Sequence, residues 1–357
     1  MTLSHALEHT SARQPAPPAI ESQEQLAEVL SQPTPGVIET LAALPGDIAI
    51  LGVGGKMGPT LARMARRASD AAGTRRRIIG VSRFTEPGLL DELSAAGVEA
   101  LPGDLLNPER VAALPDAPNV IFMAGRKFGS SGDECRTWAM NAYVPALVAE
   151  RYRTARIVVF SSGNVYPLVP VTSGGADEVC PPAPIGEYAQ SVLARERVFE
   201  YFSREHGAPM LLLRLNYAID LRYGVLLDVA QHVQAQAPID LTMGHVNVIW
   251  QRDANAVALC ALAACQSPPR IVNVTGPETI AIRWLARRFG ELLGVEPVFS
   301  GCEAETALLS NAAQCFQLFG YPSVPLEQMI QWVGHWVKIG GPTLGKPTHF
   351  EQRAGRF

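Results

Sequence analysis

Short apolar runs alternate with longer amphipathic segments over most of this chain. The runs are rich in Val and Ile and lie at residues 48–52, 77–82, 98–101, 120–124, 157–161, 210–215 and 271–274. Segments with apolar residues at helical spacing separate them, at residues 59–72, 88–96, 137–152, 188–206 and 254–265. Apolar strands that alternate with helices predict an α/β fold, in which helices cover both faces of a doubly wound parallel sheet.

Both ends of the chain depart from this alternation. The Pro-rich segment 11–18 is typical of disorder, and Ser22 is placed to cap a helix over residues 22–30 that the prolines at 33 and 35 are expected to end. Further helices are predicted over residues 221–236, 280–293 and 324–337. We therefore expect an N-terminal extension (1–45), a sheet domain (46–216 and 245–275), a smaller, mostly helical substrate-binding lobe (217–244 and 276–340) and an extended tail (341–357).

Composition argues against several classes of protein. The 357 residues carry a net charge of −4, which gives no basic surplus for binding nucleic acid. No apolar run approaches the roughly 18 residues of a membrane span, and residues 1–18 lack the apolar core of a signal peptide. The six cysteines show no Cys-x-x-Cys pair and no metal-ligand spacing. We expect a cytoplasmic protein with reduced thiols, no membrane or nucleic-acid partner and no bound metal.

A glycine-rich turn follows the first strand. Gly52, Gly55 and Gly58 stand between a predicted strand and a predicted helix, the context in which such a pattern predicts a dinucleotide-binding turn. The first glycine allows the tight turn, the second admits the pyrophosphate, and the third lets strand and helix pack closely. Lys56 and Met57 complete the turn beside the phosphates, with the Lys56 side chain expected to face solvent.

The end of the second strand bears on the choice of cofactor. NAD binders place a carboxylate there for the ribose hydroxyls, whereas this strand ends in Ser82 and Arg83. The Arg83 guanidinium can pair with a 2′-phosphate, so the sequence favours NADP over NAD. Asp104 and Leu105, after the third strand, are candidates for the adenine end, although Asp104 can equally cap the turn before the next helix.

Several motifs further along the chain carry a family resemblance. They are Ser-Ser-x-x-Val-Tyr at 161–166, Tyr-x-x-Ser at 188–191, Arg-Leu-Asn at 214–216 and Asn-Val-Thr-Gly-Pro-Glu at 273–278. Together with the glycine turn they resemble the extended short-chain dehydrogenase/reductases, the NAD-dependent epimerase/dehydratase family. The resemblance covers about residues 46–335 and implies a Rossmann-type fold.

The resemblance also implies roles for individual residues. Tyr188 falls at the acid/base tyrosine, Ser162 at the hydroxyl that binds the reacting oxygen, and Asn141 at a supporting asparagine. Ala124 and Gly125, after the fourth strand, fall where the family lines the cofactor.

One position departs from the family pattern. The family lowers the tyrosine pKa with a lysine four residues later, and this chain has Val192 there. Three accounts remain open. Another cation can substitute, Lys127 being the first candidate and Arg126 its neighbour; the nicotinamide charge and the Ser162 hydroxyl can suffice; or the site no longer performs redox chemistry.

Substrate residues are expected after the fourth, fifth and sixth strands. Arg126, Asn164, Asn216 and Arg222 are the candidates, and their polar side chains suit a sugar-like molecule. The resemblance also implies a homodimer, formed through the helices at 137–152 and 188–206. Two hypotheses follow: an NAD(P)-dependent oxidoreductase or epimerase acting on a sugar-like hydroxyl or ketone, or a catalytically silent dinucleotide-binding sensor or regulatory protein.

Overall fold

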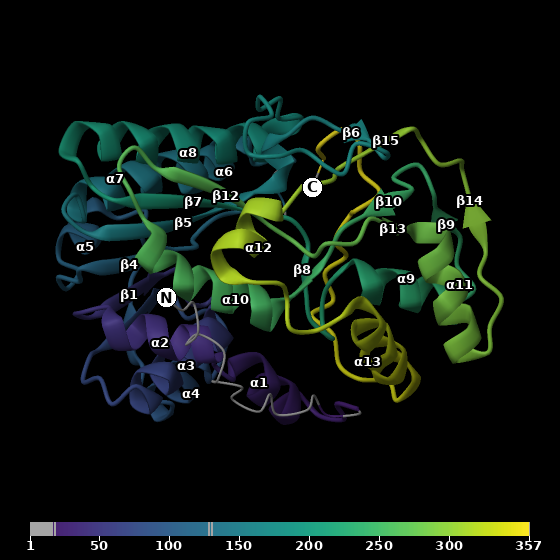
Figure 1. Cartoon of the computed structure of the whole chain (residues 1–357), viewed down its shortest axis with the longest axis horizontal. Coiled ribbons are helices and arrows are strands. Elements are labelled where there is room, and N and C mark those ends of the chain that lie inside the picture. Colours follow the sequence, from purple (N-terminus) through teal and green to yellow (C-terminus); the bar gives the residue numbers. More distant parts are fainter. Residues whose placement is uncertain (1–16, 18, 128, 130, 357) are drawn as a thin grey trace, which may run out of the picture.

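A seven-stranded parallel sheet forms the centre of the protein (Figure 1). The computed structural model describes residues 17, 19–127, 129 and 131–356. The strands are β1 (Ile48–Leu51), β2 (Ile78–Ser82), β3 (Glu99–Pro102), β4 (Asn119–Phe122), β5 (Arg156–Ser162), β7 (Met210–Leu215) and β12 (Arg270–Val274). Their order is β12-β7-β5-β4-β1-β2-β3, and all neighbours pair in parallel. The predicted Rossmann-type sheet is confirmed.

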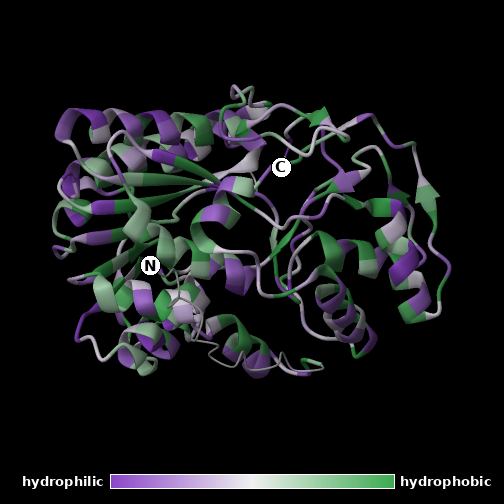
Figure 2. Cartoon of the chain, in the orientation of Figure 1, coloured by the Kyte–Doolittle hydropathy of each residue, from purple (hydrophilic) through white to green (hydrophobic). Residues whose placement is uncertain are grey.

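The strands are apolar because both faces of the sheet are covered. Ile48 and Ile50 of β1 pack in one core, and Ala49 and Leu51 pack in a second core on the opposite face. Figure 2 shows the sheet mainly in the hydrophobic colour, with polar residues concentrated on the outer helices. The strand order reverses between β1 and β4, and the crevice at the carboxyl ends of these strands is where such folds bind ligands.

The helices predicted around the sheet are present, together with one short helix, α5 (Pro108–Ala112), that was not predicted. The others are α3 (Gly58–Ala71), α4 (Leu89–Ala95), α6 (Glu134–Trp138), α7 (Val144–Arg151), α8 (Gly186–His206) and α10 (Gln251–Cys260). The predicted helix over 137–152 is interrupted by a π-helical turn at Ala139–Tyr143, between α6 and α7. Single π-helical turns often occur at functional sites, and Asn141 lies in this one.

The described part of the N-terminal region packs against the rest of the protein. Helix α1 (Gln23–Ser31) begins after the predicted cap, where Ser22 Oγ accepts the Gln25 N–H at 3.1 Å. Pro35 occupies the first turn of a second helix, α2 (Pro35–Ala43), because proline is well tolerated at that position. The disorder predicted over 11–18 falls, apart from residue 17, outside the described residues.

The predicted C-terminal lobe contains the three expected helices, together with a further helix, α12 (Ala313–Phe319), and short strands that were not predicted. The expected helices are α9 (Val225–Gln234), α11 (Ile282–Leu293) and α13 (Leu326–Lys338). Two-residue strands pair as β9 (Ile239–Asp240) with β14 (Phe299–Ser300), and β10 (His245–Val246) with β13 (Ile280–Ala281). Nearer the sheet, β6 (Val169–Pro170) pairs with β15 (Thr306–Ala307), and β8 (Ala218–Ile219) with β11 (Ile249–Trp250). In the described part of the chain, no helix combines the length and apolar character of a membrane span.

The C-terminal tail is packed, although residues 341–356 form no helix or strand. Thr348 is 1% exposed, and its N–H and hydroxyl both donate to Asp228 Oδ2 of α9, at 2.8 and 2.5 Å. Phe350 is buried in the core of the lobe, and Gly355 lies against Gly186, at the start of α8. The tail therefore returns from the lobe to the sheet domain, and Figure 1 places the C-terminus between these two parts.

Candidate active site and cofactor site

The turn between β1 and α3 requires glycine at two of its three predicted positions. Gly52 has a φ of 94°, and a Cβ there would lie 2.6 Å from the backbone nitrogen of Ala124. A Cβ at Gly58 would lie 2.1 Å from the carbonyl oxygen of Val53. At Gly55 the nearest atom to an added Cβ is 3.4 Å away, so the protein itself leaves that position open. This open position fits the close approach of a pyrophosphate.

Lys56 and Met57, between Gly55 and Gly58, are both at least partly buried. The Lys56 ammonium donates to the carbonyl oxygen of Ala218 at 2.7 Å and lies 4.4 Å from the centroid of the Tyr223 ring. The expectation that Lys56 faces solvent is therefore wrong. Burial lowers the pKa of Lys56 to about 8, although nearby Asp220 opposes this shift. Met57 is buried and precedes the first residue of α3.

The carboxyl end of β2 lies beside the glycine turn. A Cβ at Gly54 would come within 2.3 Å of Ser82 Oγ, which shows how closely the two segments approach. Ser82 Oγ accepts the N–H of Phe84 at 3.2 Å, and the Arg83 side chain is exposed. Ser82 and Arg83 are thus placed where the ribose of a dinucleotide would meet the second strand.

The two candidates after β3 differ from each other. Asp104 is exposed, and its carboxylate accepts the N–H of Leu106 at 3.0 Å, so it caps the turn that leads to α5. Leu105 is buried in the core between the sheet and the helices α5, α7 and α8. Of these two, only the Asp104 side chain reaches solvent.

Two hydroxyl groups meet at the end of β5. Tyr188, in the first turn of α8, is coupled by a side-chain hydrogen bond to Ser162, the last residue of β5. Ser162 Oγ also accepts from Asn164 Nδ2 at 3.0 Å. Burial raises the pKa of Tyr188, whereas the charge of Arg195 and the hydrogen bond with Ser162 lower it. The structure thus brings together three of the predicted site residues.

Asn141 connects these elements from the π-helical turn. Its Oδ1 accepts from Arg126 N at 2.9 Å and from Arg195 Nη2 at 2.8 Å. Its Nδ2 donates to Arg126 O at 2.9 Å and to Ser191 Oγ at 3.0 Å. A completely satisfied buried amide of this kind fixes the loop after β4 against α8. Asn141 therefore supports the site without reaching Tyr188 itself.

Comparison with known proteins agrees with this geometry. The model of the NAD dependent epimerase/dehydratase family matches residues 48–219, which include the glycine turn, Ser162 and Tyr188. Residues 48–219 belong to this family. No curated protein matches the chain.

Solved structures of similar fold include UDP-sugar epimerases. UDP-glucose 4-epimerase of Thermotoga maritima, solved with UDP-glucose, has a TM-score of 0.67 and 16% identity, over 82% of this chain and 98% of that chain. UDP-glucuronic acid 4-epimerase of Bacillus cereus, solved with UDP-glucuronic acid and NAD, has a TM-score of 0.68 and 17% identity, over 82% and 99%. Pal of Bacillus thuringiensis has a TM-score of 0.67 and 17% identity, over 82% and 99%. At such identities the likeness shows the fold alone. Each of these three structures leaves almost a fifth of this chain unmatched.

Val192 lies in an apolar cluster of the chain. It is 1% exposed and packs with Val165, Tyr166 and Ala176. Its side chain carries no charge, and the pKa of Tyr188 is raised chiefly by burial.

A buried arginine that the sequence motifs did not indicate lies near Tyr188. Arg195 is 5% exposed; its Nη1 donates to Phe160 O at 2.7 Å, and its Nη2 donates to Asn141. Burial lowers the pKa of Arg195 to about 10, so the guanidinium stays protonated at neutral pH. Its spacing of seven residues from Tyr188, two helical turns along α8, was the available signal in the sequence.

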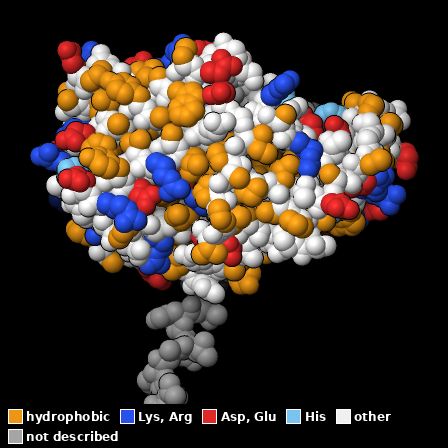
Figure 3. Space-filling view, turned by 90° about the horizontal axis from the view of Figure 1, so that it is seen from above, with side chains coloured by type: hydrophobic (Ala, Val, Ile, Leu, Met, Phe, Trp, Pro, Cys, Tyr) orange, Lys and Arg blue, Asp and Glu red, His pale blue; other side chains and the backbone are white. Residues whose placement is uncertain are grey.

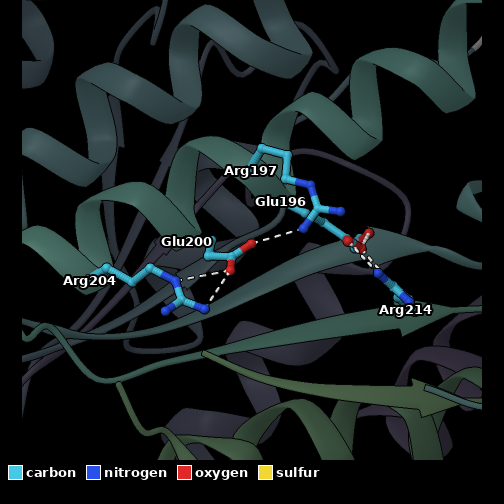
Figure 4. Close-up of polar contacts among 6 residues, drawn as sticks. Glu196, Arg197, Glu200, Arg204 and Arg214 are labelled. Atoms are coloured by element: carbon cyan, nitrogen blue, oxygen red, sulfur yellow. Dashed lines mark hydrogen bonds and ion pairs between the residues drawn. The ribbon is translucent and has the colours of Figure 1, made fainter. Parts of the chain in front are cut away.

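Two carboxylates of α8, Glu196 and Glu200, are paired with arginines (Figure 4). Glu196 accepts from Arg214 of β7 through both oxygens, at 2.9 and 2.6 Å, and from Ser161 Oγ at 2.5 Å. Glu200 pairs with Arg197 and Arg204 on the outer surface of the helix. The Glu196 carboxylate therefore binds side chains of β7 and β5.

Lys127 lies between Tyr188 and the tail. Its Nζ is 6.0 Å from the centroid of the Tyr188 ring and donates to the carbonyl oxygen of Thr348 at 3.3 Å. Burial lowers the pKa of Lys127 to about 8, against the opposing charges of Asp228 and Glu351. The tail thus contacts Lys127, the first candidate to replace the missing lysine of the family pattern.

The remaining substrate candidates are held by other protein groups. Arg126 pairs with Asp133 at 2.8 Å within its own loop. Asn216 is 2% exposed and donates to Asn247 Oδ1 at 3.0 Å, so it joins the end of β7 to the segment before β11. Arg222 pairs with the buried Asp220 at 3.1 Å, and its carbonyl oxygen accepts the N–H of Leu344 in the tail. Among the described residues, no cluster of His, Cys, Asp or Glu could hold a metal ion.

Proposed function

We propose that this protein is an NAD(P)-dependent oxidoreductase or epimerase that acts on a sugar-like hydroxyl or ketone. The observation that carries the proposal is the meeting of Tyr188 and Ser162 at the carboxyl end of β5, on the same edge of the parallel sheet as the glycine turn after β1. A protein that only binds a dinucleotide has no use for two convergent hydroxyls there.

The chain's own groups suit the movement of a proton to or from a carbinol oxygen. Ser162 donates a hydrogen bond to the reacting oxygen and orients it toward Tyr188 Oη. In the oxidative direction Tyr188 Oη accepts the hydroxyl proton, and in the reductive direction it returns that proton. The nicotinamide, when bound, supplies or accepts the hydride. Asn141 keeps α8 and the loop after β4 in register while the proton moves.

The glycine turn fits a dinucleotide, and we propose NADP as the preferred form. Gly55 leaves an open approach to the backbone, and the exposed Arg83 follows β2 where an NAD-specific carboxylate would stand. The UDP-glucuronic acid 4-epimerase of Bacillus cereus was solved with NAD, so NAD remains the alternative for this chain.

We propose a compact sugar or sugar acid as the substrate. Arg222, the clearest candidate anchor for a diphosphate, is already neutralised by Asp220. The tail runs along the segment after β7 through the contact of Leu344 with Arg222, and it reaches Lys127 through Thr348. A nucleotide diphosphate would compete with these contacts, whereas a smaller ligand next to Tyr188 would not.

We also propose that the protein forms a homodimer through α6, α7 and α8. Trp138 of α6 and Tyr143 of the following π-helical turn are 36% and 49% exposed, and exposed apolar side chains gathered on one surface are typical of a protein interface. Figure 3 shows further apolar side chains spread over the face on which α8 lies.

Comparing turnover by the wild type and by Tyr188→Phe distinguishes an enzyme from a catalytically silent dinucleotide-binding protein. The uncharged Val192 favours the silent protein. We expect reduced nicotinamide to be consumed with a panel of keto-sugars, and Tyr188→Phe to lower kcat by about 100-fold or more. Tyr201→Phe, an exposed tyrosine on the same helix, is the matched control. Tight cofactor binding without turnover in the wild type, together with activity created by Val192→Lys, would instead support the silent protein.

A further inference from the structure

Arg195 projects toward the region of Tyr188. Residues seven apart share one face of a helix, and long helical side chains lean toward the helix N-terminus. Both effects carry the Arg195 guanidinium back along α8 in the direction of Tyr188. The two side chains also interact electrostatically, since each shifts the pKa of the other.

The guanidinium is held from three separate elements. Phe160 O, on β5 two residues before Ser162, accepts from Nη1, and Asn141 Oδ1, in the π-helical turn, accepts from Nη2. A Cβ at Gly125 would lie 2.6 Å from Nη2, so the loop after β4 passes directly over the charge. These contacts fix the guanidinium at the junction of the elements that carry Ser162, Tyr188 and the predicted nicotinamide site.

Among the described residues, no carboxylate accepts a hydrogen bond from the Arg195 guanidinium. Its two partners are a neutral carbonyl and a neutral amide, and its Nε is buried without a hydrogen-bond partner among the described residues. The neighbouring Glu196 is engaged by Arg214 and Ser161 instead. A buried charge with neutral partners acts strongly on groups nearby.

Other groups that interact with Tyr188 come from the loop after β4 and from the segment after β8. Lys127 lies over the tyrosine ring, but Asp228, Glu351 and the Thr348 carbonyl face its ammonium. The Tyr223 hydroxyl, whose pKa burial raises, also interacts with Tyr188. Lys127 thus shares its charge with two carboxylates. Arg195 interacts with one, Glu196, whose oxygens already accept hydrogen bonds from Arg214 and Ser161.

We propose that Arg195 is a positioning residue that supplies, from two turns further along α8, the positive charge that the family pattern places at position 192. The charge stabilises the Tyr188 phenolate and so lets the tyrosine take up the substrate proton. This role rests on the proposed function only in that Tyr188 is the acid/base group. Arg195 itself does not touch the substrate.

The ionisation of Tyr188 tests this role without any substrate. The full-length protein is labelled with ¹³Cζ-tyrosine, the Tyr188 resonance is assigned with Tyr188→Phe, and pH is raised. Because a positive charge favours the phenolate, Arg195→Gln should move the titration of Tyr188 to higher pH, and Arg195→Lys should keep it near the wild type. Arg197→Gln, which removes a surface charge paired with Glu200 on the same helix, should leave it unchanged.

The double variant Arg195→Gln/Val192→Lys distinguishes charge from scaffolding. Restoring a cation at position 192 should return the titration toward the wild type, which a purely structural role of Arg195 does not explain. Should Arg195→Gln fail to fold, Arg195→Met, which keeps the apolar stem of the side chain and removes its charge, is compared with Arg195→Lys instead. A wild-type titration in Arg195→Gln, or a larger shift in Lys127→Met, would overturn the proposal.

The same variants separate this inference from the proposed function. Where turnover is measurable, kcat of Arg195→Gln in the oxidative direction at pH 8 should fall about tenfold or more, and the pH profile should shift upward. If the wild type shows no turnover while Arg195→Gln still shifts the Tyr188 titration, the proposed function fails and the coupling stands.

Discussion

At the scale of single residues, the glycine turn shows which positions the fold requires and which it leaves to a ligand. Gly52 and Gly58 meet backbone atoms of the protein itself, whereas Gly55 meets almost nothing. Sequence could predict these roles because glycines at this spacing between a strand and a helix are typical of the turn, although the contact at Gly52 comes from the distant Ala124. It could not predict the buried state of Lys56 or the position of Arg195, because their partners come from distant elements.

Alanine substitutions at Gly58 and Gly55 should therefore affect different properties, the stability of the protein and its affinity for the cofactor. Gly58→Ala pushes a Cβ into the Val53 carbonyl and should lower the free energy of unfolding by roughly 1–3 kcal/mol or more. Gly55→Ala should leave that free energy nearly unchanged but weaken cofactor binding at least about tenfold. Urea unfolding and fluorescence titration measure the two quantities. Equal cofactor affinity in Gly55→Ala and the wild type would contradict the role given to the open position.

At the scale of elements, periodicity predicted the strands and helices of the sheet domain because each spans several residues with a clear apolar pattern. The paired strands of the lobe have two residues each, too few for any period to show. The tail was also beyond prediction by periodicity. Its position depends on Thr348 and Phe350, single residues that dock on α9 and the lobe core.

Removal of residues 341–357 tests the role of the tail. The truncation exposes the site of Phe350, whose burial is worth about 2–3 kcal/mol, and leaves Asp228 without its Thr348 donors. We expect a lower melting temperature and weaker discrimination against bulky sugar nucleotides in a competition assay. Leu344→Ala, at an exposed tail position, is the control. Unchanged discrimination after truncation would contradict the limit on substrate size.

At the scale of the whole molecule, the N-terminal helices contribute buried residues to the core of the lobe and to one core of the sheet domain. Leu26 and Leu30 of α1 are buried in the core of the lobe, and Val37 and Leu41 of α2 are buried in the core beside α3. The interpretation of residues 1–45 as an extension thus understates how closely helices α1 and α2 pack against both parts. The homodimer stays a prediction, since it came from the family resemblance.

The central claim is that this chain binds a nicotinamide dinucleotide at the turn between β1 and α3, and the most direct test is titration of purified protein with NADPH and NADH. We predict saturable binding of one molecule per chain, tighter for NADPH than for NADH. Arg83→Ala should weaken NADPH binding about tenfold, because a charge-assisted hydrogen bond contributes roughly 1.5–3 kcal/mol, and should leave NADH binding unchanged. Failure of the wild type to bind either nucleotide would contradict the account.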